Sequence, residues 1–183
     1  LVNEHKKENP SLSITARSAG TDMTGGPLNE SIILDFTRFM NKVLEVKPDF
    51  AIAEPGCLYR DFDKETRKIN RMMPAYTASR DICALGGMVG NNAGGEKSIK
   101  YGKVENHIKE LDIIFSDGKE YTVKPLTKKE LEEKISKNDF ESELYKKVWQ
   151  LIESNYDVIM SGKPDVSKNS SGYYLWNVYD KET

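Results

Sequence analysis

The apolar residues near the start of the chain fall in short runs that polar residues and turn formers separate. Alternation with a period of two, and brief apolar runs bounded by Gly, Pro or Asp, predict β-strands. Residues 37–40 predict a single helical turn between two of these runs. The strands that we expect lie at residues 11–16, 31–35, 43–46 and 50–53, the last of them ended by Pro55-Gly56.

In later parts of the chain, apolar residues recur at the spacing of an α-helix. Residues 58–69 carry apolar side chains at helical intervals among charges and predict a surface helix whose buried stripe is Leu58, Phe62 and Ile69. Capping boxes at 127–130 and 138–141 predict two more helices, which run to about Lys137 and Tyr156. The stripe of the last helix is expected to contain Leu144, Val148, Leu151, Ile152 and Ile159.

A hairpin is predicted between these helical parts. Residues 107–115 and 119–123 are strand-like, and Ser116-Asp117-Gly118 joins them. The sequence has no internal repeat, and its strands outnumber its helices without regular alternation. We therefore expect an α+β fold, with mixed sheets and flanking helices, rather than a doubly wound one.

The length of 183 residues fits one domain. We expect a core over 11–127, a helical part over 128–160 and an irregular tail over 161–183. The tail carries aromatic residues that need a surface to cover, in this chain or in a partner: Tyr173, Tyr174, Trp176 and Tyr179.

Composition excludes several classes of protein. The 27 basic and 29 acidic residues leave a net charge of −2, which would not attract nucleic acid, so any phosphate recognition must be local. Cys57 and Cys83 match neither a disulfide framework nor a zinc motif, and we expect both to be buried in a reducing compartment. The chain has neither a membrane-length apolar run nor a signal segment, which predicts a soluble, cytoplasmic protein. The first residues, LVNEHKKENP, lack an initiator Met and read like the polar end of a helix, which is typical of a piece of a longer chain.

Two glycine-rich stretches are the candidates for function. The first loop, residues 17–26 (RSAGTDMTGG), follows a predicted strand, and its backbone N–H groups and hydroxyls can form a concave site for a diphosphate. The second loop, residues 79–102, shows no helical or strand period between Gly86 and Gly95, and so bare a backbone is suited to close approach by a partner. The alternatives are a plain β-turn with a solvated Arg17 and a long surface loop.

Other chemistries find little support. Residues 90–98 (GNNAGGEKS) nearly reproduce a phosphate-binding loop, but Glu96 stands where the lysine should be. No glycine set has the dinucleotide spacing G-x-G-x-x-G, and there is no G-x-S-x-G elbow. His5 and His107 are too far apart to suggest a metal site, and we expect His107 to be structural or partly buried. The pattern is typical of a domain that binds a cofactor whose chemistry it does not itself supply.

The ordered motifs resemble a known family. RSAGTDMTGG, then EPG at 54–56, PAYTASR from Pro74, LGGMVGNNAGG and KYG resemble the FAD-binding domain of the vanillyl-alcohol oxidase and p-cresol methylhydroxylase superfamily, especially its D-lactate dehydrogenase and glycolate oxidase branch. The resemblance covers residues 11–127 well and 168–176 more loosely. It implies a partial FAD-binding domain, with another strand-helix unit before residue 11 and a substrate-binding cap domain after residue 176.

The resemblance also implies a cofactor and its contacts. It predicts noncovalent FAD, because members that attach FAD covalently often carry a histidine that the first loop lacks. Asp22 departs from the small or hydroxyl residue of many relatives, and a carboxylate near a diphosphate is unfavourable unless it caps a turn. The predicted contacts are Arg17, Ser18, Ala19, Gly20, Thr21, Asp22, Pro74, Ser79, Leu85, Gly86, Gly87, Gly90, Asn91, Asn92 and Gly94, with Tyr101 and Ile108 as further lining.

Three functions compete at this point. The first is the FAD-binding portion of a flavin-dependent oxidoreductase that oxidises a 2-hydroxy acid, such as D-lactate or glycolate, by hydride transfer to FAD and passes electrons to an unknown acceptor. The isolated piece is then expected to bind FAD weakly and to be inactive. The second is a noncatalytic nucleotide or diphosphate-binding module. The third is a structural domain whose C-terminal aromatic residues dock a partner.

Overall fold

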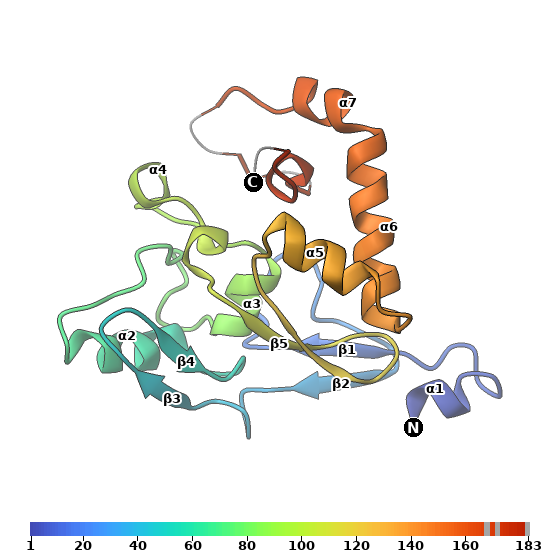
Figure 1. The fold of residues 1–183 in the computed structure, drawn as a ribbon. Helices are drawn as coiled ribbons and strands as arrows, with labels where there is room; N and C mark the ends of the chain where they lie inside the picture. The colour runs from blue at the N-terminus through green and yellow to red at the C-terminus, as the bar shows by residue number, and fades with distance from the viewer. Residues whose placement is uncertain (167–168, 171–172, 182–183) are drawn as a thin grey trace. The chain divides into compact units, whose positions relative to one another are not determined.

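The protein is described here by a computed structural model that covers residues 1–166, 169–170 and 173–181. Its contacts divide the chain into two compact units, Leu1–Ile108 and Lys109–Thr183, and each is treated by itself. Figure 1 shows the order of the elements. The division falls inside the 11–127 region that the sequence suggested as a single core, so the hairpin belongs to the second unit.

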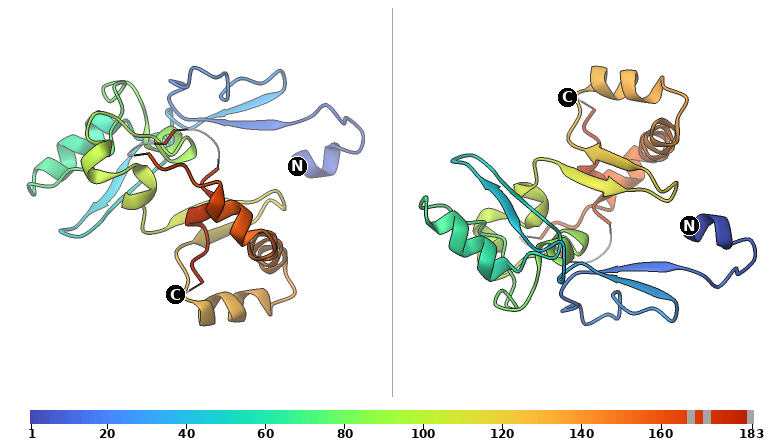
Figure 2. Two further views of the ribbon diagram at one scale, coloured as in Figure 1. Left: turned by 90° about the horizontal axis from the view of Figure 1, so that it is seen from above. Right: turned by 90° about the horizontal axis from the view of Figure 1, so that it is seen from below.

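The strands of the first unit form two small sheets. β1 (Ile14–Arg17) pairs in parallel with β2 (Ile32–Asp35), and the two lie side by side in both views of Figure 2. β3 (Val43–Val46) pairs antiparallel with β4 (Ala51–Ala53). Parallel pairing requires a long crossover, and residues 18–31, which contain most of the first loop, provide it. The predicted strands and the mixed-sheet α+β class are confirmed.

Helices and turns complete the first unit. A short α1 (Val2–His5) precedes the sheets, and α2 (Tyr59–Arg67) follows them. The later elements are α3 (Leu85–Gly90), α4 (Ser98–Tyr101) and the 3₁₀ turn η1 (Val104–His107). Residues 36–39 form a turn, and the Met40 N–H donates to the Phe36 carbonyl at 3.0 Å, which is the hydrogen-bond spacing of the single helical turn that the sequence predicted.

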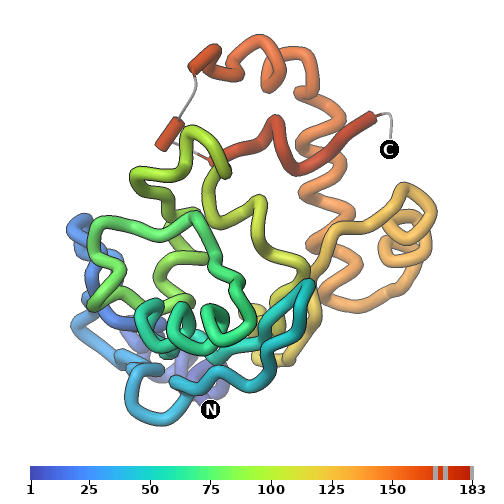
Figure 3. The backbone as a smooth tube through the Cα atoms, turned by 90° about the vertical axis from the view of Figure 1, so that its left-hand side faces the viewer, coloured from blue at the N-terminus to red at the C-terminus, as the bar shows by residue number. Residues whose placement is uncertain are grey.

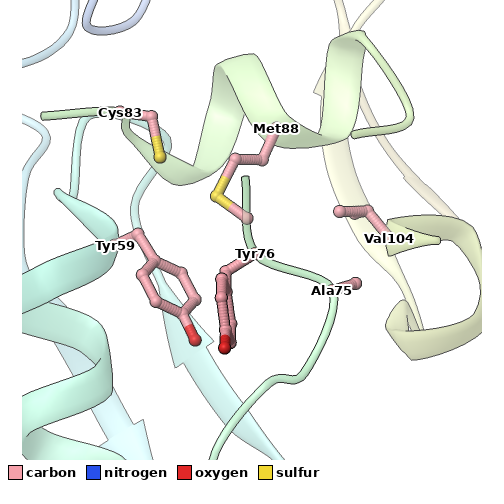
Figure 4. Close-up of a cluster of buried hydrophobic side chains, with 6 residues drawn as sticks. All are labelled: Tyr59, Ala75, Tyr76, Cys83, Met88 and Val104. Atoms are coloured by element: carbon pink, nitrogen blue, oxygen red, sulfur yellow. The ribbon is translucent and has the colours of Figure 1, made fainter. Parts of the chain in front are cut away.

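The core of the first unit lies between α2, α3 and the segment before α3. Its buried side chains, drawn in Figure 4, are Tyr59, Ala75, Tyr76, Cys83, Met88 and Val104. The Tyr59 and Tyr76 rings lie 5.7 Å apart at a tilt of 46°, a favourable arrangement for aromatic pairs. Both cysteines are free and buried, as predicted.

Two predictions for the first unit are wrong. The stretch after Gly86 is not irregular, because α3 forms there: Met88 is buried in the core cluster, with Leu85 and Val89 packed against it, and this burial outweighs the poor helix propensity of glycine. The stripe of α2 consists of Tyr59, Phe62 and Thr66; Leu58 is only the N-cap, and Ile69, beyond the helix end, is 40% exposed.

The second unit opens with the predicted hairpin, β5 (Leu111–Ile114) paired with β6 (Glu120–Val123). α5 (Lys128–Ile135) begins at the predicted capping box, in which the Thr127 hydroxyl accepts from the Glu130 N–H. α6 (Phe140–Ser154), α7 (Tyr156–Ser161) and the 3₁₀ turn η2 (Leu175–Asn177) follow, and Figure 3 traces this succession from yellow-orange to red.

Details of the second unit differ from expectation. The second capping box is formed by Asp139 and Ser142 instead of Asn138 and Glu141, since the helix begins one residue later. In the predicted stripe Ile152 is buried, but Val148 is 38% and Leu151 57% exposed. Residues 107–110 are not part of the strand.

In the tail, Tyr174 and Trp176 stack with centroids 5.2 Å apart, while Tyr173 is 90% exposed. Three residues of the 168–176 motif, Lys168, Ser171 and Gly172, lie outside the described residues. Among the described residues, no helix is both long and apolar enough to cross a membrane.

Candidate functional site

The first loop leaves the end of β1 through a left-handed turn. Gly20 has a φ of +67° and Gly25 a φ of +86°, conformations that L side chains rarely adopt. The guanidinium of Arg17 packs against Gly20, so that a Cβ added there would lie 2.6 Å from its carbon and from a terminal nitrogen. The geometry of the turn therefore favours glycine at two of the three glycine positions of the first loop, Gly20 and Gly25.

Asp22 caps this turn from within. Its Oδ2 accepts hydrogen bonds from the Thr24 hydroxyl at 2.6 Å and from the Gly26 N–H at 3.0 Å. These two bonds lower the pKa of the Asp22 carboxyl, and the Asn91 amide of the second loop lowers it slightly further. The Asp22 carboxylate, which departs from the residue type of many relatives, thus stabilises the turn of the first loop.

The second loop is attached to the EPG segment that precedes α2. The Gly86 N–H donates to the Pro55 carbonyl at 2.8 Å, and the Leu85 N–H donates to the Cys57 carbonyl at 2.9 Å. A Cβ on Gly86 would lie 2.8 Å from the Pro55 Cβ, so only glycine permits this approach. α3 consequently starts at a position that the Pro55 backbone fixes.

The two loops meet at the same carbonyl. The Ser18 hydroxyl of the first loop donates to the Pro55 oxygen at 2.7 Å. A Cβ on Gly87 would make an ordinary contact, 3.6 Å from the Ser18 Cβ, and a Cβ on Gly90 would meet nothing within 4 Å. Gly87 and Gly90 are three residues apart and share a face of α3, so they leave bare backbone beside the first loop.

That bare face fits the cofactor that the resemblance implies. A cofactor with a flat ring needs backbone that it can approach closely, and Gly87 and Gly90 provide it. Its diphosphate needs hydrogen-bond donors, which the backbone of a left-handed turn such as that at Gly20 can supply. Two hollows of about 580 and 380 Å³ lie elsewhere in the first unit, and no glycine of either loop lines them. The candidate site is therefore the open strip of surface beside Gly87 and Gly90, where α3 lies next to Ser18 of the first loop; this strip is called the groove from here on.

The end of the second loop is held by side chains. Asn92 has a φ of +42°, and its amide donates to the Glu105 carboxylate at 2.9 Å while its oxygen accepts from the Glu105 N–H at 3.1 Å. Gly94 packs on the Ser98 hydroxyl, and a Cβ on Gly95 would lie only 2.0 Å from the Tyr76 carbonyl. These interactions hold the shape of the second loop.

The PAYTASR segment packs beside this part of the second loop. Pro74 is half-buried, and the hydroxyls of Thr77 and Ser79 lie 2.8 Å apart. The Tyr76 hydroxyl donates to Glu96 at 2.6 Å, and the cations of Arg80 and Lys97 lie 5.0 and 5.4 Å from the centroid of its ring. Glu96, which removed the phosphate-loop signature from the sequence, therefore anchors Tyr76.

The remaining predicted contacts differ in their surroundings. Ala19 is half-buried and Thr21 exposed in the first loop, near the groove. Leu85 and Ile108 pack against the core cluster. Tyr101 is 44% exposed on α4, with the Lys100 ammonium 5.1 Å from the centroid of its ring.

One residue that the sequence did not single out as a site residue is Pro55. Its EPG motif was visible, but the role belongs to a backbone carbonyl, which no side-chain pattern reveals. His107 is exposed rather than partly buried, and its Nε2 lies 3.0 Å from the Tyr101 carbonyl. Across the described residues, no cluster of three or more His, Cys, Asp or Glu could hold a metal ion.

Comparison with known proteins agrees with these motifs. Residues 5–124 match the family described as FAD binding domain. D-2-hydroxyglutarate dehydrogenase of Escherichia coli K12 is 27% identical over 175 residues, which are 94% of this chain and 17% of that protein. D-lactate dehydrogenase of Archaeoglobus fulgidus is 26% identical over 111 residues, or 60% of this chain and 25% of that protein.

A solved structure supports the same fold. That of 6-hydroxy-D-nicotine oxidase from Arthrobacter nicotinovorans superposes with a TM-score of 0.56 at 23% identity, over 66% of this chain and 26% of that one. This chain thus spans between about one sixth and one quarter of the length of these proteins. The resemblance to the superfamily of p-cresol methylhydroxylase is confirmed, and the chain belongs to the FAD binding domain family.

Proposed function

We propose that the chain binds FAD noncovalently in the groove between the first loop and the bare face of α3. One observation supports this proposal above all: the Ser18 hydroxyl of the first loop and the Gly86 N–H of the second loop both donate to the Pro55 carbonyl. The two loops are thereby held together, and the backbone at Gly87 and Gly90 is left uncovered. Backbone N–H groups of the first loop would face the diphosphate. Noncovalent binding is favoured because the first loop contains neither histidine nor cysteine.

In this proposal the chain positions the cofactor and shields one side of it. FAD supplies two-electron redox chemistry when bound, and the protein supplies orientation and electrostatic tuning. The turn at Gly20 and the Asp22 cap present the loop backbone, while α3 keeps its side chains away from the groove at Gly87 and Gly90.

We further propose that the whole protein oxidises the CH–OH group of a D-2-hydroxy acid. The names of the relatives support this substrate class, since they include a D-2-hydroxyglutarate and a D-lactate dehydrogenase. Because the chain spans only 17% of the first of them, we assign substrate recognition, the catalytic groups and the contact with the electron acceptor to the whole protein, and we expect the 183 residues alone to be inactive.

Titration of the purified chain with FAD tests the cofactor proposal. We expect a shifted visible flavin spectrum on binding and release of all flavin into the supernatant after acid precipitation, which a covalent link would prevent. Competition with ADP separates FAD binding from a general diphosphate module, since the module would bind ADP as tightly as FAD. Absence of any spectral change at saturating FAD would refute the proposal.

The substrate proposal needs the full-length protein. Anaerobic addition of D-lactate, D-2-hydroxyglutarate or glycolate is expected to bleach the flavin absorbance, whereas the L-enantiomers of the first two leave it unchanged. Bleaching by none of these acids would contradict the substrate class while leaving FAD binding intact.

A further inference from the structure

The EPG motif at residues 54–56 is built into the backbone at the centre of the first unit. The Glu54 N–H donates to the Lys42 carbonyl at 2.9 Å, and its carboxylate accepts from the Lys42 N–H at 2.8 Å. A Cβ on Gly56 would lie 2.1 Å from the Phe36 carbonyl oxygen, and the Gly56 N–H donates to Met40. The residues on both sides of Pro55 are therefore fixed.

The carbonyl oxygen of Pro55, held in this fixed backbone, accepts two hydrogen bonds. One lone pair accepts from the Gly86 N–H at 2.8 Å and the other from the Ser18 hydroxyl at 2.7 Å. The second loop has additional attachments nearby, since the Leu85 N–H donates to Cys57 and the Tyr59 N–H donates to Cys83. The first loop reaches this backbone through the Ser18 hydroxyl.

We infer that Ser18 is a positioning residue: its bond to the Pro55 carbonyl fixes where the first loop lies relative to α3 before the cofactor arrives. The inference rests on the proposed function, because the groove is the site proposed for FAD. It also changes the role expected of Ser18, since a hydroxyl whose only proton is donated to Pro55 has none left for a phosphate oxygen.

The physical consequence is preorganisation. Without the hydroxyl, the first loop keeps its Asp22 cap and the interaction of Asp22 with Asn91 at the end of α3, but it loses the bond that ties its first residues to the Pro55 backbone, where α3 begins. FAD would then have to order the loop as it binds, and this ordering lowers affinity without removing any contact to the cofactor.

Ser18→Ala in the 183-residue chain tests the inference, with Ser13→Ala as the matched control. The Ser13 hydroxyl is also half-buried and bonded, to Asn29 at 3.2 Å, but it lies before the start of β1, at the other end of that strand from the first loop. Two measurements are made on each variant: amide hydrogen exchange without FAD, and the affinity and association rate for FAD.

We expect Ser18→Ala to speed exchange in residues 20–26 at least threefold while α2 and α3 exchange as before, and to weaken FAD binding about tenfold, mainly through a slower association rate. A purely structural role would instead speed exchange in α2 and α3, and the control should change neither loop exchange nor affinity. Unchanged exchange in the loop, or faster exchange with normal FAD affinity, overturns the inference. One result separates this inference from the proposed function. If the wild-type chain does not bind FAD, the proposed function fails; faster exchange of the first loop in Ser18→Ala would then still show that the bond to Pro55 determines the geometry of the loop.

Discussion

Gly87→Ala should make the free protein more stable and its complex with FAD weaker. Gly87 lies in the middle of α3 on an exposed face, and the added Cβ would make only an ordinary contact, 3.6 Å from the Ser18 Cβ. Replacing a helical glycine by alanine is favourable by about 1 kcal/mol when the space is free. For a chain of this size that gain raises the melting temperature by about 2–4 °C.

The same methyl group occupies the groove in which we propose that FAD lies. We expect at least a tenfold loss of affinity, which corresponds to about 1.4 kcal/mol, and a larger loss for Gly87→Val. Thermal unfolding without FAD and titration of flavin fluorescence measure the two effects separately. Gly86→Ala provides a contrast, because its Cβ would lie 2.8 Å from Pro55 and should lower stability itself.

A second control is Ser154→Ala, an exposed position at the end of α6 in the second unit, which should leave FAD affinity unchanged. If Gly87→Ala and Gly87→Val both bind FAD like wild type, the cofactor does not approach this face of α3. If Gly87→Ala lowers the melting temperature, the open surroundings described for Gly87 are wrong.

Three further outcomes are expected. Gly20→Val should lose FAD binding and lower the melting temperature, because a side chain is strained at φ +67° and would meet the Arg17 guanidinium; normal binding would exclude the turn from the site. Cys57 and Cys83 should react with a thiol reagent only after unfolding, because both are buried and desolvation raises the pKa of Cys57 to about 11; rapid labelling of the native chain would contradict this. The pKa of Tyr121 is raised to about 12, chiefly because its phenol donates a hydrogen bond to the Asp117 carboxylate. This bond should stabilise the folded chain fully below about pH 10, and the stabilisation should be lost as the pH rises towards 12. In alkaline unfolding curves the free energy of unfolding of Tyr121→Phe should lack this decline, and a decline identical to that of wild type would refute the assignment.

Local chemistry made several elements predictable. The capping box at Thr127 and the hairpin turn at Asp117-Gly118 depend on residues within a few positions of one another, so the sequence carries the whole signal. The same holds for the glycines of the first loop, whose positive φ at Gly20 and Gly25 follows from a turn that few other residues can adopt.

Elements that depend on packing were harder to predict. α3 contains three glycines, which disfavour a helix locally, and it forms because Met88 is buried in the same core cluster as Tyr76 and Val104. The start of α6 was predicted one residue too early. Asn138 and Asp139 are both favourable N-cap residues, and in the structure Asp139 is the N-cap.

The sequence by itself determined the family, the strands, the three longest helices (α2, α5 and α6) and the two loops as the candidate site, because motif order and local propensity are properties of the chain. Only the tertiary structure decided how the loops are joined. The joint is the carbonyl oxygen of Pro55, a backbone atom that every residue type would offer equally, and its partners Ser18 and Gly86 lie 37 and 31 positions away. Interactions of a backbone acceptor across such separations leave no periodic pattern, so they appear only when the chain is folded.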